Sequence, residues 1–163
     1  WRHGDWIEIE AESGQCVIYG RSDSTLNRGG VRMGTSEFYQ VVESLPEIVG
    51  ALVIDTTGLG RHGEETVGKL LLFVVLQDAF VFDDLLANRI RERIKTDLSP
   101  RYLPDAVFSV LEIPQTLNGK KLEVPVKRLF QGFELSKSVS LEAVKNPDSL
   151  KPFLELAERF LRG

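Results

Sequence analysis

The chain has 163 residues, of which 42% are hydrophobic and 27% are charged. This composition is typical of one globular domain with a hydrophobic core, or of one domain with a fragment of another. The net charge of −4 and the pI near 5.3 argue against general binding to nucleic acids or anionic membranes. The sequence has no basic, apolar leader segment, and no apolar run approaches the roughly 18 residues that a membrane-spanning helix needs.

The one cysteine, Cys16, cannot form an internal disulfide and suits a reducing cytoplasm, so we expect a cytoplasmic protein. Because Cys16 lies in an apolar stretch, we expect a packed thiol rather than a nucleophile. The sequence begins at Trp1 without a methionine, and we therefore expect a piece of a longer protein.

Residues 5–20 alternate between apolar and polar side chains around a Ser13-Gly14 turn, which predicts a β-hairpin. Residues 20–34 then combine glycines with arginines, and Arg28-Gly29-Gly30 favours a second, tighter turn. Glycine lets the backbone approach a ligand closely, and arginine offers forked donors suited to phosphate. This stretch is either a loop that faces an anionic, phosphorylated ligand or an ordinary turn with solvated arginines.

A first helix is predicted to open at residues 34–37 with a hydroxyl N-cap followed by an acid. Its apolar positions have helical spacing, which indicates one buried face: Phe38, Val41, Val42 and Leu45. Residues 48–55 and 69–77 are apolar runs of strand length, and their composition predicts burial on both faces. A polar, glycine-containing loop at 56–68 joins them, and its His62 is interpreted as a solvated side chain.

Asp83-Asp84 is predicted to cap a second helix, whose other faces carry Arg89, Arg91, Arg93 and Lys95. A third core strand is expected at 107–113, a short helix follows with Gly132 at its end, and a final amphipathic helix starts at 146–148. These elements predict an α+β fold, with a small mixed sheet of about three core strands flanked by helices and preceded by β-hairpins. Their order is compatible with a split βαβ arrangement that has its helices on one side.

Three segments resemble motifs of the acyl-adenylate-forming (ANL) superfamily, in that family's order: Trp1-Arg2-His3-Gly4-Asp5, then Gly20-Arg21-Ser22-Asp23 through Gly30-Val31-Arg32-Met33-Gly34, then Pro114-Gln115-Thr116-Leu117-Asn118-Gly119-Lys120. The match spans about the first 130 residues. Residues 117–128 and the long tail look most like the acetoacetate-activating CoA synthetases of the superfamily. His3 stands where the first motif usually has threonine.

The resemblance implies a two-step reaction with ATP and coenzyme A. A carboxylate first joins the α-phosphate of ATP and releases pyrophosphate, and the thiol of coenzyme A then attacks the acyl-adenylate. By resemblance, Lys120 is the adenylation lysine, a compact cation between two anionic reactants. The adjacent Lys121 is the alternative candidate for this role, and both lysines could instead be a solvated pair on a turn.

The resemblance assigns further roles. Asp5, Arg21 and Arg32 would contact ATP or AMP, and Asp23 would be the hinge. Gly30 would line the pantetheine passage of coenzyme A, and Lys95 is a candidate for its 3′-phosphate, although a solvated helix face explains Lys95 equally well. Mg²⁺ is implied with ATP, but no ligand set for a metal is visible in the sequence.

These motifs divide the chain into residues 1–22, the end of a large N-terminal adenylation domain, and residues 23–163, a mobile C-terminal domain with a helical tail. The phosphate-gripping loop and the acyl pocket of the superfamily are not recognised in the sequence, so we expect the missing domain of the same polypeptide to be the partner. The other expected partner is a small carboxylate; acetate or propionate are alternatives to acetoacetate. A non-catalytic binding module is the alternative from another class.

Overall fold

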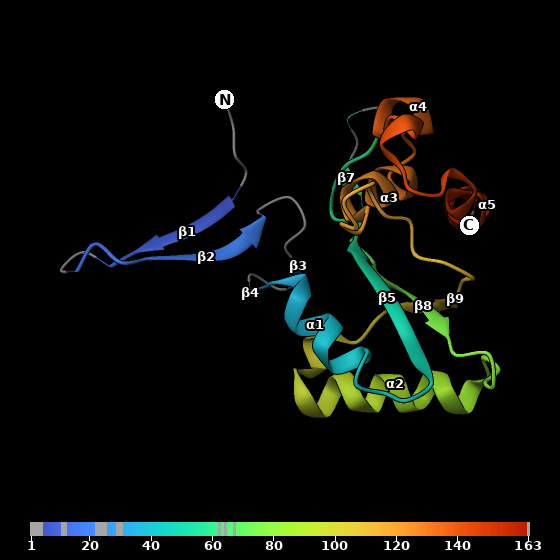
Figure 1. Cartoon of the computed structure of the whole chain (residues 1–163), viewed down its shortest axis with the longest axis horizontal. Helices are drawn as coiled ribbons and strands as arrows, with labels where there is room; N and C mark the ends of the chain where they lie inside the picture. Colours follow the sequence, from blue (N-terminus) through green and yellow to red (C-terminus); the bar gives the residue numbers. More distant parts are fainter. Residues whose placement is uncertain are drawn as a thin grey trace.

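The computed structural model describes residues 5–10, 13–21, 26–28, 31–61, 63, 65–66 and 68–162 (Figure 1). The strands and α-helices follow in the order β1 (Asp5–Ile9), β2 (Cys16–Arg21), β3 (Leu26–Arg28), β4 (Val31–Met33), α1 (Thr35–Val42), β5 (Ile48–Asp55), β6 (Gly58–Leu59), β7 (Glu65–Thr66), β8 (Leu70–Leu76), α2 (Asp84–Asp97), β9 (Ala106–Ser109), α3 (Glu123–Phe130), α4 (Leu135–Ser138) and α5 (Lys151–Arg162). Short 3₁₀ helices cover Pro100–Tyr102, Leu141–Ala143 and Pro147–Leu150.

The central sheet has three strands in the order β5-β8-β9, which confirms the predicted small mixed sheet. β5 runs antiparallel to β8, and β9 runs parallel to it. Alternate residues of β5 and β8 belong to two separate cores, because successive side chains of a strand point to opposite faces. One core receives Ala51, Val53, Leu70, Leu72 and Val74, and the other receives Leu52, Ile54, Leu71 and Phe73.

Helices cover both faces of this sheet, so the expectation of helices on one side was wrong. The first core contains side chains of α1 and α2, among them Phe38 and Ile90. The second contains side chains of α3 and α5, where Phe130 and Phe153 pack against Phe73 of β8. Strands that are apolar on both faces need a cover on each face, and the C-terminal third of the chain supplies the second one.

The helix ends agree with the sequence in one case and differ in another. Asp83 caps α2 as predicted, and its side chain accepts a hydrogen bond of 2.8 Å from the N–H of Leu86. The predicted hydroxyl cap of α1 was wrong, because the N-cap residue is Gly34, which has no side chain that could accept a hydrogen bond. Thr35 is already the first helical residue.

The third core strand is shorter than the predicted 107–113. β9 ends at Ser109, and after the bond from the N–H of Val110 to the C=O of Val74 the chain leaves the sheet. Val110 and Ile113 are nevertheless buried, because their side chains pack into the second core. The loop at 56–68 also differs from the prediction, since it contains the small antiparallel hairpin β6-β7.

Two hairpins precede the sheet, as predicted. β1 and β2 pair antiparallel and project away from the rest of the molecule (Figure 1). Cys16 is exposed at the start of β2, so the expectation of a packed thiol was wrong: this end of the hairpin does not pack on the core. β3 and β4 form the second hairpin, which is anchored by Leu26 and Met33 in the first core.

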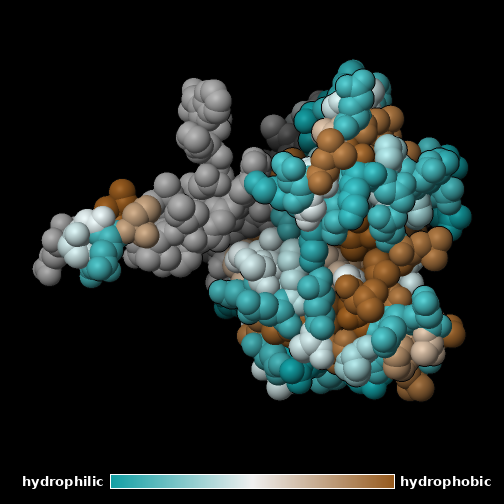
Figure 2. Space-filling model, viewed as in Figure 1, coloured by the Kyte–Doolittle hydropathy of each residue, from teal (hydrophilic) through white to brown (hydrophobic). Residues whose placement is uncertain are grey.

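Polar side chains cover most of the face shown in Figure 2, around smaller apolar areas. Outside the β1-β2 hairpin, six large apolar side chains among the described residues are more than half exposed: Val49, Val81, Leu85, Leu111, Leu117 and Leu161. Among the described residues, no helix has the length and apolar character needed to cross a membrane.

Candidate active site

Lys120 lies on a tight hairpin formed by residues 115–121. Gln115 and Lys121 face each other in an antiparallel bridge. Within it, Thr116 donates its N–H to the C=O of Lys120 at 2.8 Å, and its hydroxyl oxygen accepts the N–H of Lys120 at 3.1 Å. Gly119 has a φ of +78°, a left-handed conformation that favours glycine. The local sequence therefore closes this turn by its own hydrogen bonds.

A segment of the C-terminal tail pairs with the other side of the same hairpin. Thr116 and Val144 form an antiparallel bridge. The N–H of Leu117 donates to the C=O of Ala143 at 3.0 Å, and the N–H of Lys145 donates to the C=O of Gln115 at 2.9 Å. The first side of the hairpin, residues 115–117, is thus the middle of three short extended segments, between residues 120–121 and 143–145. The sequence of 133–146 shows no clear pattern that would predict this pairing.

The two adjacent lysines of the hairpin have different surroundings. Lys120 is exposed, and its amine forms no ion pair with any described residue. The Lys121 ammonium lies 2.7 Å from the Glu43 carboxylate, and its side chain is only 23% exposed. Of the two lysines, only Lys120 presents a cation that can reach a ligand without first breaking an internal ion pair.

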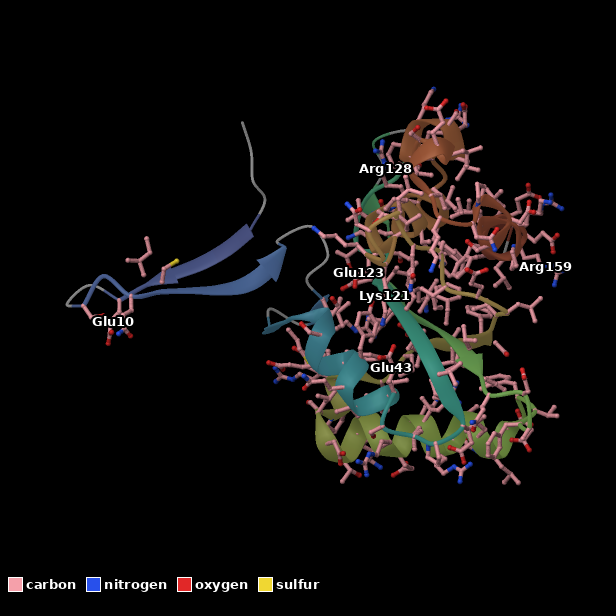
Figure 3. All side chains as sticks on the ribbon, in the orientation of Figure 1. Glu10, Glu43, Lys121, Glu123, Arg128 and Arg159 are labelled. Atoms are coloured by element: carbon pink, nitrogen blue, oxygen red, sulfur yellow. The ribbon has the colours of Figure 1, made fainter. Side chains whose placement is uncertain are left out.

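Lys121 is part of a cluster that joins α1, β5, the hairpin and α3 (Figure 3). Its ammonium lies 3.5 Å from the centroid of the Tyr39 ring. The Tyr39 hydroxyl donates to Glu123 at 2.6 Å and accepts from the N–H of Val53 at 3.3 Å. Burial, and then the nearby Glu123 carboxylate, raise the pKa of the Tyr39 hydroxyl far above its ordinary value, so this hydroxyl keeps its proton.

The structure brings together two of the residues predicted to contact the nucleotide. Asp5 and Arg21 occupy opposite positions in the register of β1 and β2. Arg32 lies in β4 opposite Asn27. The side chains of Asp5, Arg21 and Arg32 lie outside the described part of the structure, so their contacts with a nucleotide stay predictions.

Asp23 and Gly30, together with His62, fall outside the described residues. The hairpin that flanks Gly30 is well tied to the body. Arg28 of β3 donates to the C=O of Gly68 at 3.2 Å and pairs with Asp105 at 3.0 Å. These bonds hold the base of the predicted glycine loop against the start of β8.

Lys95 lies on the exposed face of α2, and its ion pair is with a residue of the same helix rather than with the Lys120 hairpin. Its ammonium is 3.5 Å from the carboxylate of Glu92, one turn earlier. Arg93 and Arg89 on the same helix pair with Asp97 and Glu47. The basic helix face that the sequence predicts is therefore largely matched by acids within the chain.

A surface hollow of about 490 Å³ lies between the end of β8 and the start of α2. Its lining includes Glu47, Phe80, Val81, Leu85 and Arg89, and it contains none of the predicted site residues.

Sequence reasoning missed another group, which consists of Tyr39 and Glu43 and their partner Lys121 on the hairpin. Their spacing of four residues on one helix was a visible signal, but nothing near them in the sequence points to Lys121.

No family model matches the chain, but comparisons with individual proteins are informative. The chain is 38% identical over 156 residues to an acetoacetyl-CoA synthetase of Caenorhabditis elegans, which covers 95% of this chain and 21% of the relative. It therefore spans about a fifth of the length of the curated relatives that it matches.

Solved structures give the same result. The acetoacetyl-CoA synthetase of Streptomyces lividans superposes with a TM-score of 0.77 and 46% identity, over 98% of this chain and 23% of that one. A benzoate CoA ligase of Burkholderia xenovorans has a TM-score of 0.55 and 27% identity, over 74% of this chain and 22% of that one. The fold is that of the C-terminal parts of adenylate-forming enzymes.

Proposed function

Because this chain belongs to the adenylate-forming superfamily and is homologous over nearly its whole length to acetoacetyl-CoA synthetases, we propose that it is the C-terminal part of such a synthetase. The whole enzyme would activate acetoacetate with ATP and transfer the acyl group to coenzyme A. The chain spans about a fifth of the length of these relatives. Under this proposal, the N-terminal adenylation domain of the same polypeptide would be its partner, and the chain alone would not catalyse the reaction. A cytoplasmic location is part of this proposal.

The first step requires a cation between two anions. An oxygen of the acetoacetate carboxylate attacks the α-phosphorus of ATP, the bond to the β-phosphate breaks, and pyrophosphate leaves. Lys120 donates hydrogen bonds to the oxygens on which negative charge accumulates. This role is supported by the position of Lys120, which is exposed on a hairpin closed by Thr116. The charge of its neighbour Lys121 is already paired with Glu43.

In the second step the thiolate sulfur of coenzyme A attacks the acyl carbonyl carbon, and the bond to AMP breaks. Gly30 would line the pantetheine passage, and Lys95 would meet the 3′-phosphate only by giving up its contact with Glu92. Asp5, Arg21 and Arg32 would hold the nucleotide. Rotation of residues 23–163 against residues 1–22, with Asp23 as the hinge, would turn the domain from one orientation to another. In the first orientation the domain presents Lys120 for adenylation, and in the second it presents the loop of Gly30 for thioester formation.

The test compares two variants of the full-length enzyme in separate half-reactions. Lys120→Ala should lower acetoacetate-dependent pyrophosphate release on the order of 10²–10³-fold, while thioester formation from supplied acyl-adenylate stays near wild type. Gly30→Leu should produce the reverse pattern, because its side chain obstructs the thiol. Equal loss in both half-reactions in either variant would refute the assignment.

The substrate is tested with the same enzyme on a panel of short carboxylic acids. Acetoacetate should give the highest kcat/KM, and preference for acetate or propionate would identify another short-chain acyl-CoA synthetase. If the enzyme releases no pyrophosphate with any acid, the non-catalytic binding module becomes the better description.

A further inference from the structure

The outer edge of the central sheet is covered by two side chains of the α1 segment. β5 is an edge strand, and the backbone N–H groups on an unpaired edge need other acceptors. The N–H of Ala51 donates to the Glu43 carboxylate at 2.9 Å, and the N–H of Val53 donates to the Tyr39 hydroxyl at 3.3 Å. Tyr39 and Glu43 are therefore fixed to the sheet by its backbone.

The same two side chains hold the residue that follows Lys120. Lys121 places its ammonium 2.7 Å from Glu43 and 3.5 Å from the centroid of the Tyr39 ring, so an ion pair and a cation–π contact act on one group. The second attachment comes two residues later, where Glu123 accepts the Tyr39 hydroxyl at 2.6 Å. The chain after Lys120 is thus tied to the sheet edge at two points.

The direction of the Lys120 side chain follows from that attachment. Successive side chains of an extended segment point to opposite sides. Lys121 is turned inward to Glu43, and Lys120, its neighbour in the hairpin, is exposed. Without the inward contact, the hairpin keeps its backbone bonds to residues 143–145, but Lys121 is no longer fixed to the sheet edge beside Lys120. A misplacement of about 1 Å can cost on the order of 10²-fold in rate.

We propose that Tyr39, Glu43 and Lys121 form a brace that positions Lys120 for the adenylation step. Lys121 is a positioning residue and touches no substrate. This inference rests on the proposed role of Lys120 and assigns a function to the lysine beside it. It differs from a general role in stability because it predicts damage to one half-reaction only.

The experiment uses the full-length enzyme, with Lys121→Met to remove the charge and keep the apolar stem. Adenylation should fall roughly tenfold, and thioester formation from supplied acyl-adenylate should stay within about twofold of wild type. Glu43→Gln keeps an acceptor for the N–H of Ala51 and should cause a similar, one-sided loss. The double variant should be no worse than either single variant, because both remove the same contact.

Two further variants complete the design. Lys137→Met removes a lysine that pairs with Glu134 at 3.9 Å outside the brace, and it should leave both half-reactions unchanged. Tyr39→Phe keeps the ring under the Lys121 ammonium and removes only the hydroxyl. If Lys121→Met fails to fold, Tyr39→Phe carries the test, with the same one-sided loss expected.

The outcomes separate the brace from the proposed function. If Lys120→Ala loses adenylation but Lys121→Met, Glu43→Gln and Tyr39→Phe all retain it, the brace is refuted and the proposed function stands. If the brace variants lose both half-reactions equally, with lower thermal stability, their role is structural and the inference fails. If Lys120→Ala itself retains adenylation, the proposed function fails, and the brace with it.

Discussion

Arg28 and Asp105 are 77 residues apart in the sequence and form an ion pair of 3.0 Å. The same carboxylate oxygen of Asp105 accepts the N–H of Leu70 at 2.7 Å, and Arg28 also donates to the C=O of Gly68. One arginine therefore joins the β3-β4 hairpin to the start of both β8 and β9. In the sequence, Arg28 looks like one more arginine of a phosphate-binding loop.

This pair leads to a stability prediction. Arg28→Ala should lower the free energy of unfolding by about 1–3 kcal/mol, because it leaves the partly buried Asp105 carboxylate and the Gly68 carbonyl without a charged donor. Urea unfolding measures the change. The control is Arg162→Ala, which removes an exposed pair with Glu158 and should cost less than about 0.5 kcal/mol. Equal effects of the two changes would contradict a structural role of Arg28.

The helix caps give a second prediction. Asp83→Ala should cost about 1 kcal/mol, because the N–H of Leu86 loses its acceptor at the first turn of α2. Thr35→Ala should change stability by less than about 0.5 kcal/mol, since Thr35 makes no cap bond and alanine favours a helix. Both values come from denaturant unfolding. A larger loss for Thr35→Ala would instead restore the cap that the sequence predicts.

The third prediction concerns alkaline pH. The folded protein holds the Tyr39 proton more tightly than the unfolded chain, whose tyrosine has a pKa near 10. The stabilising effect of Tyr39 is therefore complete below pH 10 and decreases as the pH rises further, by at most about 1.4 kcal/mol per unit. In Tyr39→Phe this decrease should be absent, which urea unfolding at pH 8 and pH 11 can measure.

Absorbance of tyrosinate provides the check on that assignment. The chain has three tyrosines, and Tyr39 should not ionise in the folded protein below pH 11. The rise in absorbance near 295 nm up to that pH should be the same for wild type and Tyr39→Phe. A smaller rise in the variant would mean that Tyr39 ionises at an ordinary pH and is not buried against Glu123.

Much of the fold was predictable because its causes are local. The apolar run at 48–55 coincides with β5, and the run at 69–77 contains β8, since strands covered on both faces have nearly continuous apolar sequences. Asp83 was recognised as a cap because its bond spans only three residues. The sequence did not predict that helices cover both faces of the central sheet. The packing of α3 and α5 on the second face depends on contacts between distant parts of the chain.

The candidate site shows the same division. The sequence by itself determined that the motifs occur in the order of the adenylate-forming enzymes, and it narrowed the candidate for the adenylation lysine to Lys120 or its neighbour Lys121. Only the tertiary structure decided which of two neighbouring lysines is available. Lys121 is occupied by Glu43, 78 residues earlier, while Lys120 is exposed. The spacing of residues along the chain shows which side chains share a face of a helix or strand. It does not show which distant segments come into contact, because those contacts form only when the chain folds.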